Sequence, residues 1–131
     1  MLQADALRRE FKPGGHFQGV LLRYAQAYHT LVSQSVFCQA FHHIDERLAR
    51  WLLECRSRTE SDKLPLTQEY VAEIIGVRRA SVTEAVGRLT ERGVIAHARG
   101  AITVTDLEGL EAAACECHGI IRAEFERLFG I

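Results

Sequence analysis

Five arginines lie within residues 76–100, and this segment is the strongest candidate for chemistry in the chain. Two of them, Arg78 and Arg79, are adjacent. The segment holds only two glutamates, so its net charge is +3, whereas the whole chain carries -1 and residues 101–131 carry -4. A polyanion contacts one face of a protein, so the charge of that face decides binding more than the net charge of the whole chain does. The segment therefore favours a nucleic-acid partner.

A second group, Cys115, Cys117 and His118, has donor atoms that could bind a metal ion. We expect these residues to lie on one helix that runs from about residue 107 to 129. Side chains two positions apart on a helix point about 200° apart, so both thiolates could not face one ion. We therefore predict buried or half-buried structural cysteines, no metal site and no cofactor.

Other residues with reactive side chains form weaker patterns. His42 and His43 are adjacent at a predicted helix start, where their side chains diverge, and a metal site shared with Cys38 is the alternative that a zinc assay would test. The chain has no nucleophile elbow, phosphate loop or convincing pair of carboxylates. We predict that it is not an enzyme; a thiol hydrolase that uses cysteine and histidine is the remaining enzymatic alternative.

Composition limits the class of protein. With 131 residues, 47% hydrophobic and 25% charged, the chain has the size and apolar content of one globular domain, or one domain with an appendage. No apolar run approaches the roughly 18 residues that span a bilayer, and the amino terminus lacks a signal-peptide pattern. We expect a cytoplasmic protein whose four cysteines are reduced.

The arginines need elements to position them, and the flanking sequence has the pattern of two short helices joined by a tight turn. Thr67 is a suitable N-cap for the first helix, which ends at Gly76. The second helix runs from about Arg79 to Arg92, and Gly93 ends it. The positions that we expect to be buried are Val71, Ala72, Ile74, Ile75, Val82, Ala85, Val86 and Leu89. Gly76 supplies the positive φ that such a turn requires.

A hairpin follows the two helices. Val94–Ala98 and Ala101–Val104 are predicted strands, and Arg99 and Gly100 form the tight turn between them. Two helices followed by a hairpin are the order of a winged helix-turn-helix. The predicted fold class is therefore mainly α with a small β-hairpin wing, preceded by a long helix that mediates dimerisation.

Further helices flank this motif. Ile44–Cys55 carries an apolar stripe and is predicted to be helical, and residues 57–63 are predicted to be a polar loop. Asp106 is a plausible cap for the final helix, which we expect to continue from about Leu107 to Phe129.

The second helix of such a pair enters the major groove with its amino-terminal residues nearest the bases. Arg79 can donate two hydrogen bonds to guanine O6 and N7, and Glu84 can accept from cytosine N4; Thr83 lies in the same stretch. The residues better placed for phosphate oxygens are Thr67, Gln68, Arg78, Ser81 and Arg99. We expect the two adjacent arginines to project outward together.

An earlier segment has the spacing of a helix–helix interface, with mostly apolar residues alternately four and three positions apart. These seam residues are Phe17, Leu21, Tyr24, Tyr28, Leu31, Ser35 and Cys38. A helix of some 20 residues is about 30 Å long, more than the rest of the chain can cover, so we predict a homodimer. The alternative is an amphipathic helix that packs only on its own domain.

Four stretches resemble the carboxyl-terminal half of Crp/Fnr-family transcription regulators. They are CQAFHHIDERLARWLL (38–53), LPLTQEYVA (64–72), GVRRASVT (76–83) and LEAAACEC (110–117). In addition, LLRYAQ (21–26) resembles the start of that family's long dimerisation helix. We therefore divide the chain into residues 1–40, the end of a sensor domain with the dimerisation helix, and residues 41–131, the DNA-binding domain.

The resemblance implies a homodimeric regulator that binds a palindromic site in double-stranded DNA, and it makes RNA polymerase a candidate partner. Family members carry an amino-terminal β-roll sensor, where iron–sulfur sensing also resides, and this chain has no room for one. A truncation, a proteolytic fragment and a natural sensorless form are the open explanations, and no effector pocket is expected.

Two positions of the reading helix depart from the family's best-known members, which have Glu at the position of Ala80 and Arg at that of Glu84. We therefore expect a different half-site. Two other functions stay open: a sensorless protein-interaction module, such as a dominant-negative partner of a full-length regulator, and a member of another winged-helix family that binds DNA without the dimer helix.

Overall fold

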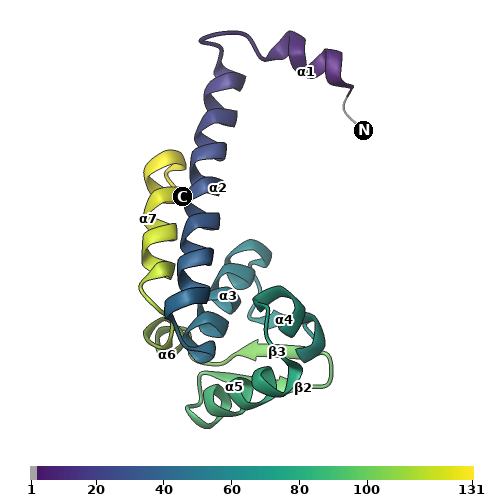
Figure 1. Ribbon diagram of the computed structural model, residues 1–131, viewed down its shortest axis with the longest axis vertical. Coiled ribbons are helices and arrows are strands. Elements are labelled where there is room, and N and C mark those ends of the chain that lie inside the picture. The colour runs from purple at the N-terminus through teal and green to yellow at the C-terminus, as the bar shows by residue number, and fades with distance from the viewer. Residues whose placement is uncertain (1–2) are drawn as a thin grey trace. The chain divides into compact units, whose positions relative to one another are not determined.

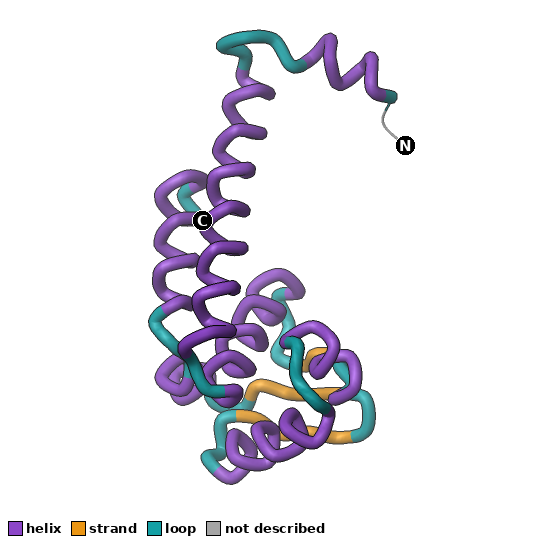
Figure 2. The backbone as a smooth tube through the Cα atoms, viewed as in Figure 1, coloured by secondary structure: helices purple, strands orange, loops and turns teal. Residues whose placement is uncertain are grey.

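The computed structural model of the protein describes residues 3–131; residues 1 and 2 of the predicted segment 1–40 lie outside it. The helices are α1 (Ala4–Glu10), α2 (His16–Phe41), α3 (Ile44–Thr59), α4 (Gln68–Ile75), α5 (Arg79–Glu91), α6 (Leu107–Ala113) and α7 (Cys117–Phe129) (Figure 1). The strands are β1 (Lys63–Leu64), β2 (Ile95–Ala98) and β3 (Ala101–Val104) (Figure 2). The order confirms a mainly helical winged helix-turn-helix.

The contacts divide the chain into two compact units. The core unit is Ser35–His118, and the helical unit consists of the residues up to Gln34 together with Gly119–Ile131. We predicted one boundary, after residue 40, whereas this division falls within α2 and groups the last residues with the first part of that helix. All residues of the helix-turn-helix and wing belong to the core unit.

The predicted caps of the helix-turn-helix are confirmed. The Thr67 hydroxyl accepts a hydrogen bond from the backbone N–H of Tyr70 at 3.2 Å, which satisfies one of the unpaired donors at the start of α4. Gly76 ends α4 with φ +69° and ψ +44°, the left-handed conformation that the turn was predicted to need. The chain therefore reverses between α4 and α5 as the residue pattern indicates.

The larger of two apolar clusters in the core unit holds the helix-turn-helix and wing together. It joins α3, α4, α5 and α6 to the sheet, and its fully buried large side chains include Leu48, Leu52, Val71, Val82, Leu89 and Leu110. One predicted core residue is wrong: Ile74 is 47% exposed. A two-turn helix that packs on one side buries its i, i+4 row, here Val71 and Ile75, and leaves the neighbouring position outside.

The hairpin gains a third strand that the sequence did not predict. β2 pairs with β3 in antiparallel register, with Ile95 opposite Val104, and β1 adds to the other side of β3, with Leu64 opposite Ile102. Residues 57–63 were predicted to be a loop, but α3 continues to Thr59, where Glu60 adopts a left-handed conformation, and Lys63 belongs to β1. A two-residue strand is too short to show a periodic pattern, so only pairing with β3 reveals it.

The final helix was predicted to be continuous, and this is wrong. α6 ends at Ala113 and α7 begins at Cys117; Ala114 between them is extended, with φ -77° and ψ 155° (Figure 2). The Asp106 cap is confirmed, since its carboxylate accepts from the backbone N–H of Gly109 at 3.0 Å. Because Cys115 and Cys117 do not share a helix, the geometric argument that excluded a common metal ion no longer applies.

In the helical unit, α7 pairs with the first part of α2. Gln26 donates to the Glu124 carboxylate at 3.2 Å, and Glu124 also accepts two hydrogen bonds from Arg127, each 2.9 Å. Ala27 and Ile121 are the buried apolar residues of the two helices in this unit. Among the described residues, no helix combines the length and apolarity needed to cross a membrane.

An ion pair fastens α5 to the start of α3. Arg88 donates from Nε and one terminal nitrogen to the two carboxylate oxygens of Asp45, both at 2.7 Å. This bidentate hydrogen bonding lowers the pKa of the Asp45 carboxyl, against an opposing effect of burial. A group whose pKa is lowered in the folded state stabilises that state above its unfolded pKa, and this stabilisation is lost as the pH falls through the folded value.

We expect Asp45→Asn to reduce the free energy of unfolding at pH 7 by about 0.5–1 kcal/mol, because the pair is half-exposed and partly screened by water. The deficit should shrink as the pH falls below the ordinary aspartate pKa of about 3.9. Urea denaturation at neutral and acidic pH measures both values. Asp5→Asn removes an ion pair whose partners are 79–80% exposed and serves as a control with no measurable effect. An Asp45→Asn deficit that did not change with pH would contradict the linkage.

Candidate nucleic-acid interface

Side chains of α2 and α3 hold the turn between α4 and α5 in place. The last carbonyl of α4, that of Ile75, accepts from the Gln39 amide at 3.4 Å and from the Arg47 guanidinium. A Cβ added at Gly76 would lie 3.1 Å from the Gln39 amide nitrogen, in a backbone conformation that other residues avoid. The start of α5 therefore has a fixed direction relative to α4.

A first hollow lies between the start of α4, the start of α5 and the wing. It has a volume of about 500 Å³, and its lining brings together four predicted DNA-binding residues: Thr67, Gln68, Arg79 and Arg99. These residues span 33 positions of sequence and come from three elements, so only the folded helix-turn-helix and hairpin place them together. We call this hollow the wing cleft.

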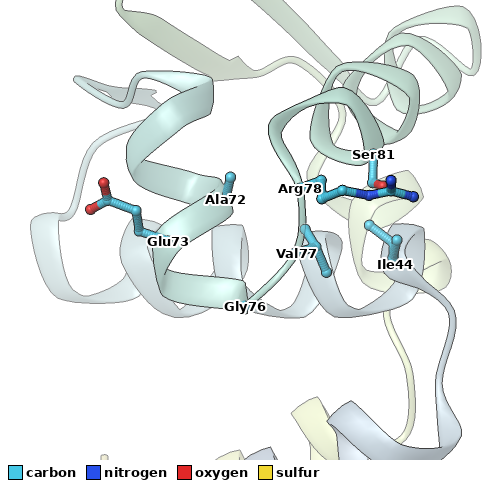
Figure 3. A pocket seen from close by; sticks show the side chains of 7 residues that line it. All are labelled: Ile44, Ala72, Glu73, Gly76, Val77, Arg78 and Ser81. Atoms are coloured by element: carbon cyan, nitrogen blue, oxygen red, sulfur yellow. The ribbon is translucent and has the colours of Figure 1, made fainter.

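A second hollow lies on the α3 side of the turn, with a volume of about 610 Å³ and with Ile44, Val77, Arg78 and Ser81 in its lining. In Figure 3, Arg78 extends from the turn toward Ser81 and Ile44, whereas Glu73 points away from them. Arg78 and Arg79 are both exposed, but they line different hollows and do not project together as we expected. Arg78 is the extended N-cap of α5, with φ -69° and ψ 146°, whereas Arg79 is the first helical residue, so their side chains leave the backbone in different directions.

The arginines at this surface form no ion pair with a carboxylate of the described residues, a property that they share with Arg9, Arg23, Arg47, Arg58 and Arg92. Arg50, Arg56, Arg88 and Arg127 form ion pairs with carboxylates, whereas no carboxylate of residues 3–131 pairs with Arg78, Arg79 or Arg99. The first turn of α5 also contains no acidic residue, so the positive end of its helix dipole is not neutralised there. The surface is therefore electrostatically suited to an anion.

The remaining predicted reading residues make contacts within the motif. The Thr83 hydroxyl lies 2.6 Å from the Gln68 side-chain oxygen and 3.1 Å from the backbone oxygen of Arg79, either of which can accept its proton. The first contact orients Gln68 across the two helices and leaves its amide nitrogen as a donor. Glu84 is 71% exposed and lies 3.8 Å from Arg88, a distance that leaves its carboxylate accessible.

The predicted seam residues of α2 differ in exposure. Tyr24 and Tyr28 are 53% and 52% exposed, and their rings stack with centroids 6.2 Å apart. Phe17, Leu21, Leu31 and Ser35 are half-buried. Cys38 is 1% exposed and lies 3.5 Å, sulfur to sulfur, from Cys115, so its own chain covers it and we leave it out of the proposed dimer surface.

Several residues of these surfaces were missed from the sequence. His97 and Ala98 also line the wing cleft, two and one positions before Arg99 on a strand that had been predicted. Extending the prediction from the wing tip into that strand would have found them. Val32 and Val36 are 44% and 67% exposed and continue the row of Tyr24 and Tyr28 at intervals of four. The heptad pattern omitted them because it alternates intervals of three and four.

This geometry defines a class of protein. Two short helices joined by a left-handed glycine, with a hairpin beside the second helix and exposed arginines at its start, are a winged helix-turn-helix of the DNA-binding type. The sequence comparison is specific: residues 46–113 match the family described as the Crp-like helix-turn-helix domain. The chain belongs to this family. Membership identifies residues 46–113 as a helix-turn-helix domain of the Crp type.

Solved structures with the same fold support this assignment. A Crp/Fnr-family regulator from Eubacterium rectale is 28% identical with a TM-score of 0.60, and the match covers 63% of this chain and 38% of that chain. A CRP-family regulator from Thermus thermophilus is 22% identical with a TM-score of 0.63, covering 86% and 55%. The catabolite activator protein of Thermus thermophilus is 23% identical with a TM-score of 0.50, covering 76% and 42%. At these identities the two Thermus structures establish the fold alone.

The chain matches only part of each of these proteins, from 38% to 55% of their length. None of the curated protein sequences compared with the chain matches it. The comparisons therefore define the family and the fold, and the activity has to be argued from this chain's own surface.

Proposed function

We propose that the chain binds double-stranded DNA in a sequence-specific manner as a homodimer, with α5 in the major groove. The observation that carries the proposal is the wing cleft, where Thr67, Gln68, Arg79 and Arg99 meet. Glu69 also lines this cleft, but neither arginine forms an ion pair with a carboxylate of residues 3–131. In a helix-turn-helix the residues that open the second helix lie nearest the base edges. Arg79 occupies the first position of α5.

The roles of the individual residues follow from their positions. Arg79 is proposed to donate to a guanine, and Glu84, exposed in the second turn of α5, to accept from a cytosine. The other residues are proposed to contact the DNA phosphates. They are Arg99 at the wing tip, Thr67 and Gln68 at the start of α4, and Arg78 and Ser81 in the second hollow. Thr83 is proposed to act partly by orienting Gln68.

A selection from random duplex DNA followed by titrations at several salt concentrations tests this function. We expect an enriched palindromic site whose half-sites are centred about 10 base pairs apart or a multiple of that distance. The logarithm of affinity should fall linearly with the logarithm of salt, with a slope of about -0.9 for each phosphate contacted. No enrichment, together with affinity that does not depend on salt, would contradict the proposal and favour a protein-interaction module.

The second copy is proposed to pack on the exposed apolar row of α2. Tyr24, Tyr28, Val32 and Val36 recur every four residues, between 44% and 67% exposed, on a 26-residue helix. Exposed apolar side chains in a continuous row mark interaction surfaces. A copy of the same helix is the matching partner because the row is self-complementary in a two-fold arrangement. A palindromic DNA site requires the same symmetry.

We expect Tyr28→Glu to convert the dimer into a monomer, because it places a charge in the middle of the apolar row. Light scattering of the purified chain measures the mass. Arg23→Glu is the control: it places a glutamate at an exposed position of α2 that is at least about 100° around the helix from every residue of the row, and it should leave the dimer intact. An unchanged mass for Tyr28→Glu would contradict the proposed surface.

A further inference from the structure

Four side chains that the DNA-binding surface does not use meet in the core unit. The donor atoms of Cys38, His42, Cys115 and Cys117 all lie within 4.8 Å of one another. The three cysteines are buried and reduced, and the His42 side chain is 12% exposed. We call these residues the Cys–His cluster.

Local structure explains how the four donors converge. Cys38 and His42 lie four positions apart at the end of α2, and the backbone N–H of His42 still donates to the Cys38 carbonyl at 3.1 Å, so their side chains lie on one face. Cys115 and Cys117 come from the interruption between α6 and α7, where the extended backbone removes the helical divergence expected for such a pair. Each segment thus contributes two donors.

The separations match those of a tetrahedral metal site. With Zn–S bonds of about 2.3 Å and Zn–N bonds of about 2.0 Å, tetrahedral geometry puts sulfurs about 3.8 Å apart and a sulfur about 3.5 Å from a nitrogen. The Cys38 and Cys115 sulfurs are 3.5 Å apart, and the Cys117 sulfur is 3.6 Å from His42 Nδ1. The donors are therefore already near the spacing that zinc imposes.

The other ring nitrogen of His42 has the partner expected of a metal ligand. His42 Nε2 lies 3.2 Å from a carboxylate oxygen of Glu116. When Nε2 donates its proton there, Nδ1 carries a lone pair directed at the cysteines. A histidine ligand is usually oriented in this way, by a carboxylate that binds its second nitrogen.

We propose that the chain binds one zinc ion through Cys38, His42, Cys115 and Cys117, with Glu116 positioning His42. Three sulfurs and one nitrogen fill the four positions around the ion, so the site is closed and structural, with no open position for catalysis. The ion would replace one thiol proton on each cysteine, releasing the protons to water, and would bind the α6–α7 connection to the end of α2.

Titration of the reduced, metal-free full chain with Co²⁺ under anaerobic conditions tests the proposal. We expect one equivalent to give the visible absorption of tetrahedral cobalt together with thiolate-to-cobalt charge transfer, and Zn²⁺ to abolish both signals. Metal analysis of freshly purified protein should find one zinc per chain. Absence of the tetrahedral spectrum, or a Cys38–Cys115 disulfide with no bound metal in fresh protein, would overturn it.

Variants locate the site. Cys38→Ser and His42→Ala should each remove the stoichiometric cobalt signal, and Glu116→Gln should weaken binding about 10–100-fold while keeping the tetrahedral spectrum. Cys55→Ser is the matched control, because this thiol lies outside the cluster and burial raises its pKa to about 11, so it stays protonated. Equal losses in Cys55→Ser and Cys38→Ser would overturn the assignment. This readout needs no DNA, so its failure is separate from failure of the proposed function.

Discussion

Arg79→Ala is expected to weaken binding to the selected DNA site by about 1–3 kcal/mol, roughly 5- to 150-fold, and to relax selectivity at one base position. Arg79 is the first residue of α5 and has no carboxylate partner among residues 3–131, so its guanidinium is available for a base. The measurement is a titration of variant and wild type with the selected duplex and with duplexes changed at each position.

Three further substitutions separate base reading from general charge. Arg79→Lys keeps the charge but loses the two-pronged donor geometry, so selectivity at that position should still fall. Arg99→Ala should weaken binding about equally for all sequences and reduce the salt slope by about 1, as expected for a phosphate contact. Arg58→Ala removes an arginine of α3 that lines neither hollow and should have no effect. Uniform weakening by Arg79→Ala, with selectivity retained, would assign Arg79 to the phosphates instead.

The largest effect on stability is expected from Glu54→Leu, which should cost about 3–5 kcal/mol of the free energy of unfolding. Glu54 accepts a hydrogen bond from Arg50 on α3, and the two side chains are only 14% and 9% exposed. Burial raises the pKa of the Glu54 carboxyl, and the Arg50 charge opposes that shift. Arg50 also lies 3.5 Å from the Ser35 hydroxyl, but its Nε has no hydrogen-bond partner in the described part of the chain. Without Glu54, a buried guanidinium loses its counter-charge.

The double variant Arg50→Met with Glu54→Leu distinguishes loss of the counter-charge from loss of packing. Because replacing both members of a buried pair by apolar side chains is often neutral or stabilising, we expect the double variant to recover most of the loss. Urea denaturation measures the midpoints. Asp62→Leu is the control: it removes the carboxylate of an ion pair with Arg56 that is 58% exposed and should cost less than about 1 kcal/mol. A Glu54→Leu variant as stable as wild type would show that a group other than Glu54 compensates the buried charge of Arg50.

Sequence patterns predicted the structure correctly where it depends on residues that are close together along the chain. The Thr67 and Asp106 caps, the left-handed Gly76, the extent of α5 and the hairpin all follow from residue types within a few positions, and the structure confirms each of them. Local hydrogen bonds and backbone sterics act over these distances, so residue identity determines them. The same local patterns were specific enough to indicate the family that the comparison then established.

Contacts between distant segments decided the rest. β1 exists only because Lys63 and Leu64 meet β3 some 40 positions later, and the break after Ala113 carries no glycine or proline that would mark it. That break is what allows Cys115 and Cys117 to face Cys38 and His42, more than 70 residues earlier in the chain. Helical periodicity predicted divergent thiols, since it describes a helix in isolation. The sequence by itself thus determined the helix-turn-helix, while tertiary packing decided which buried donors share one site.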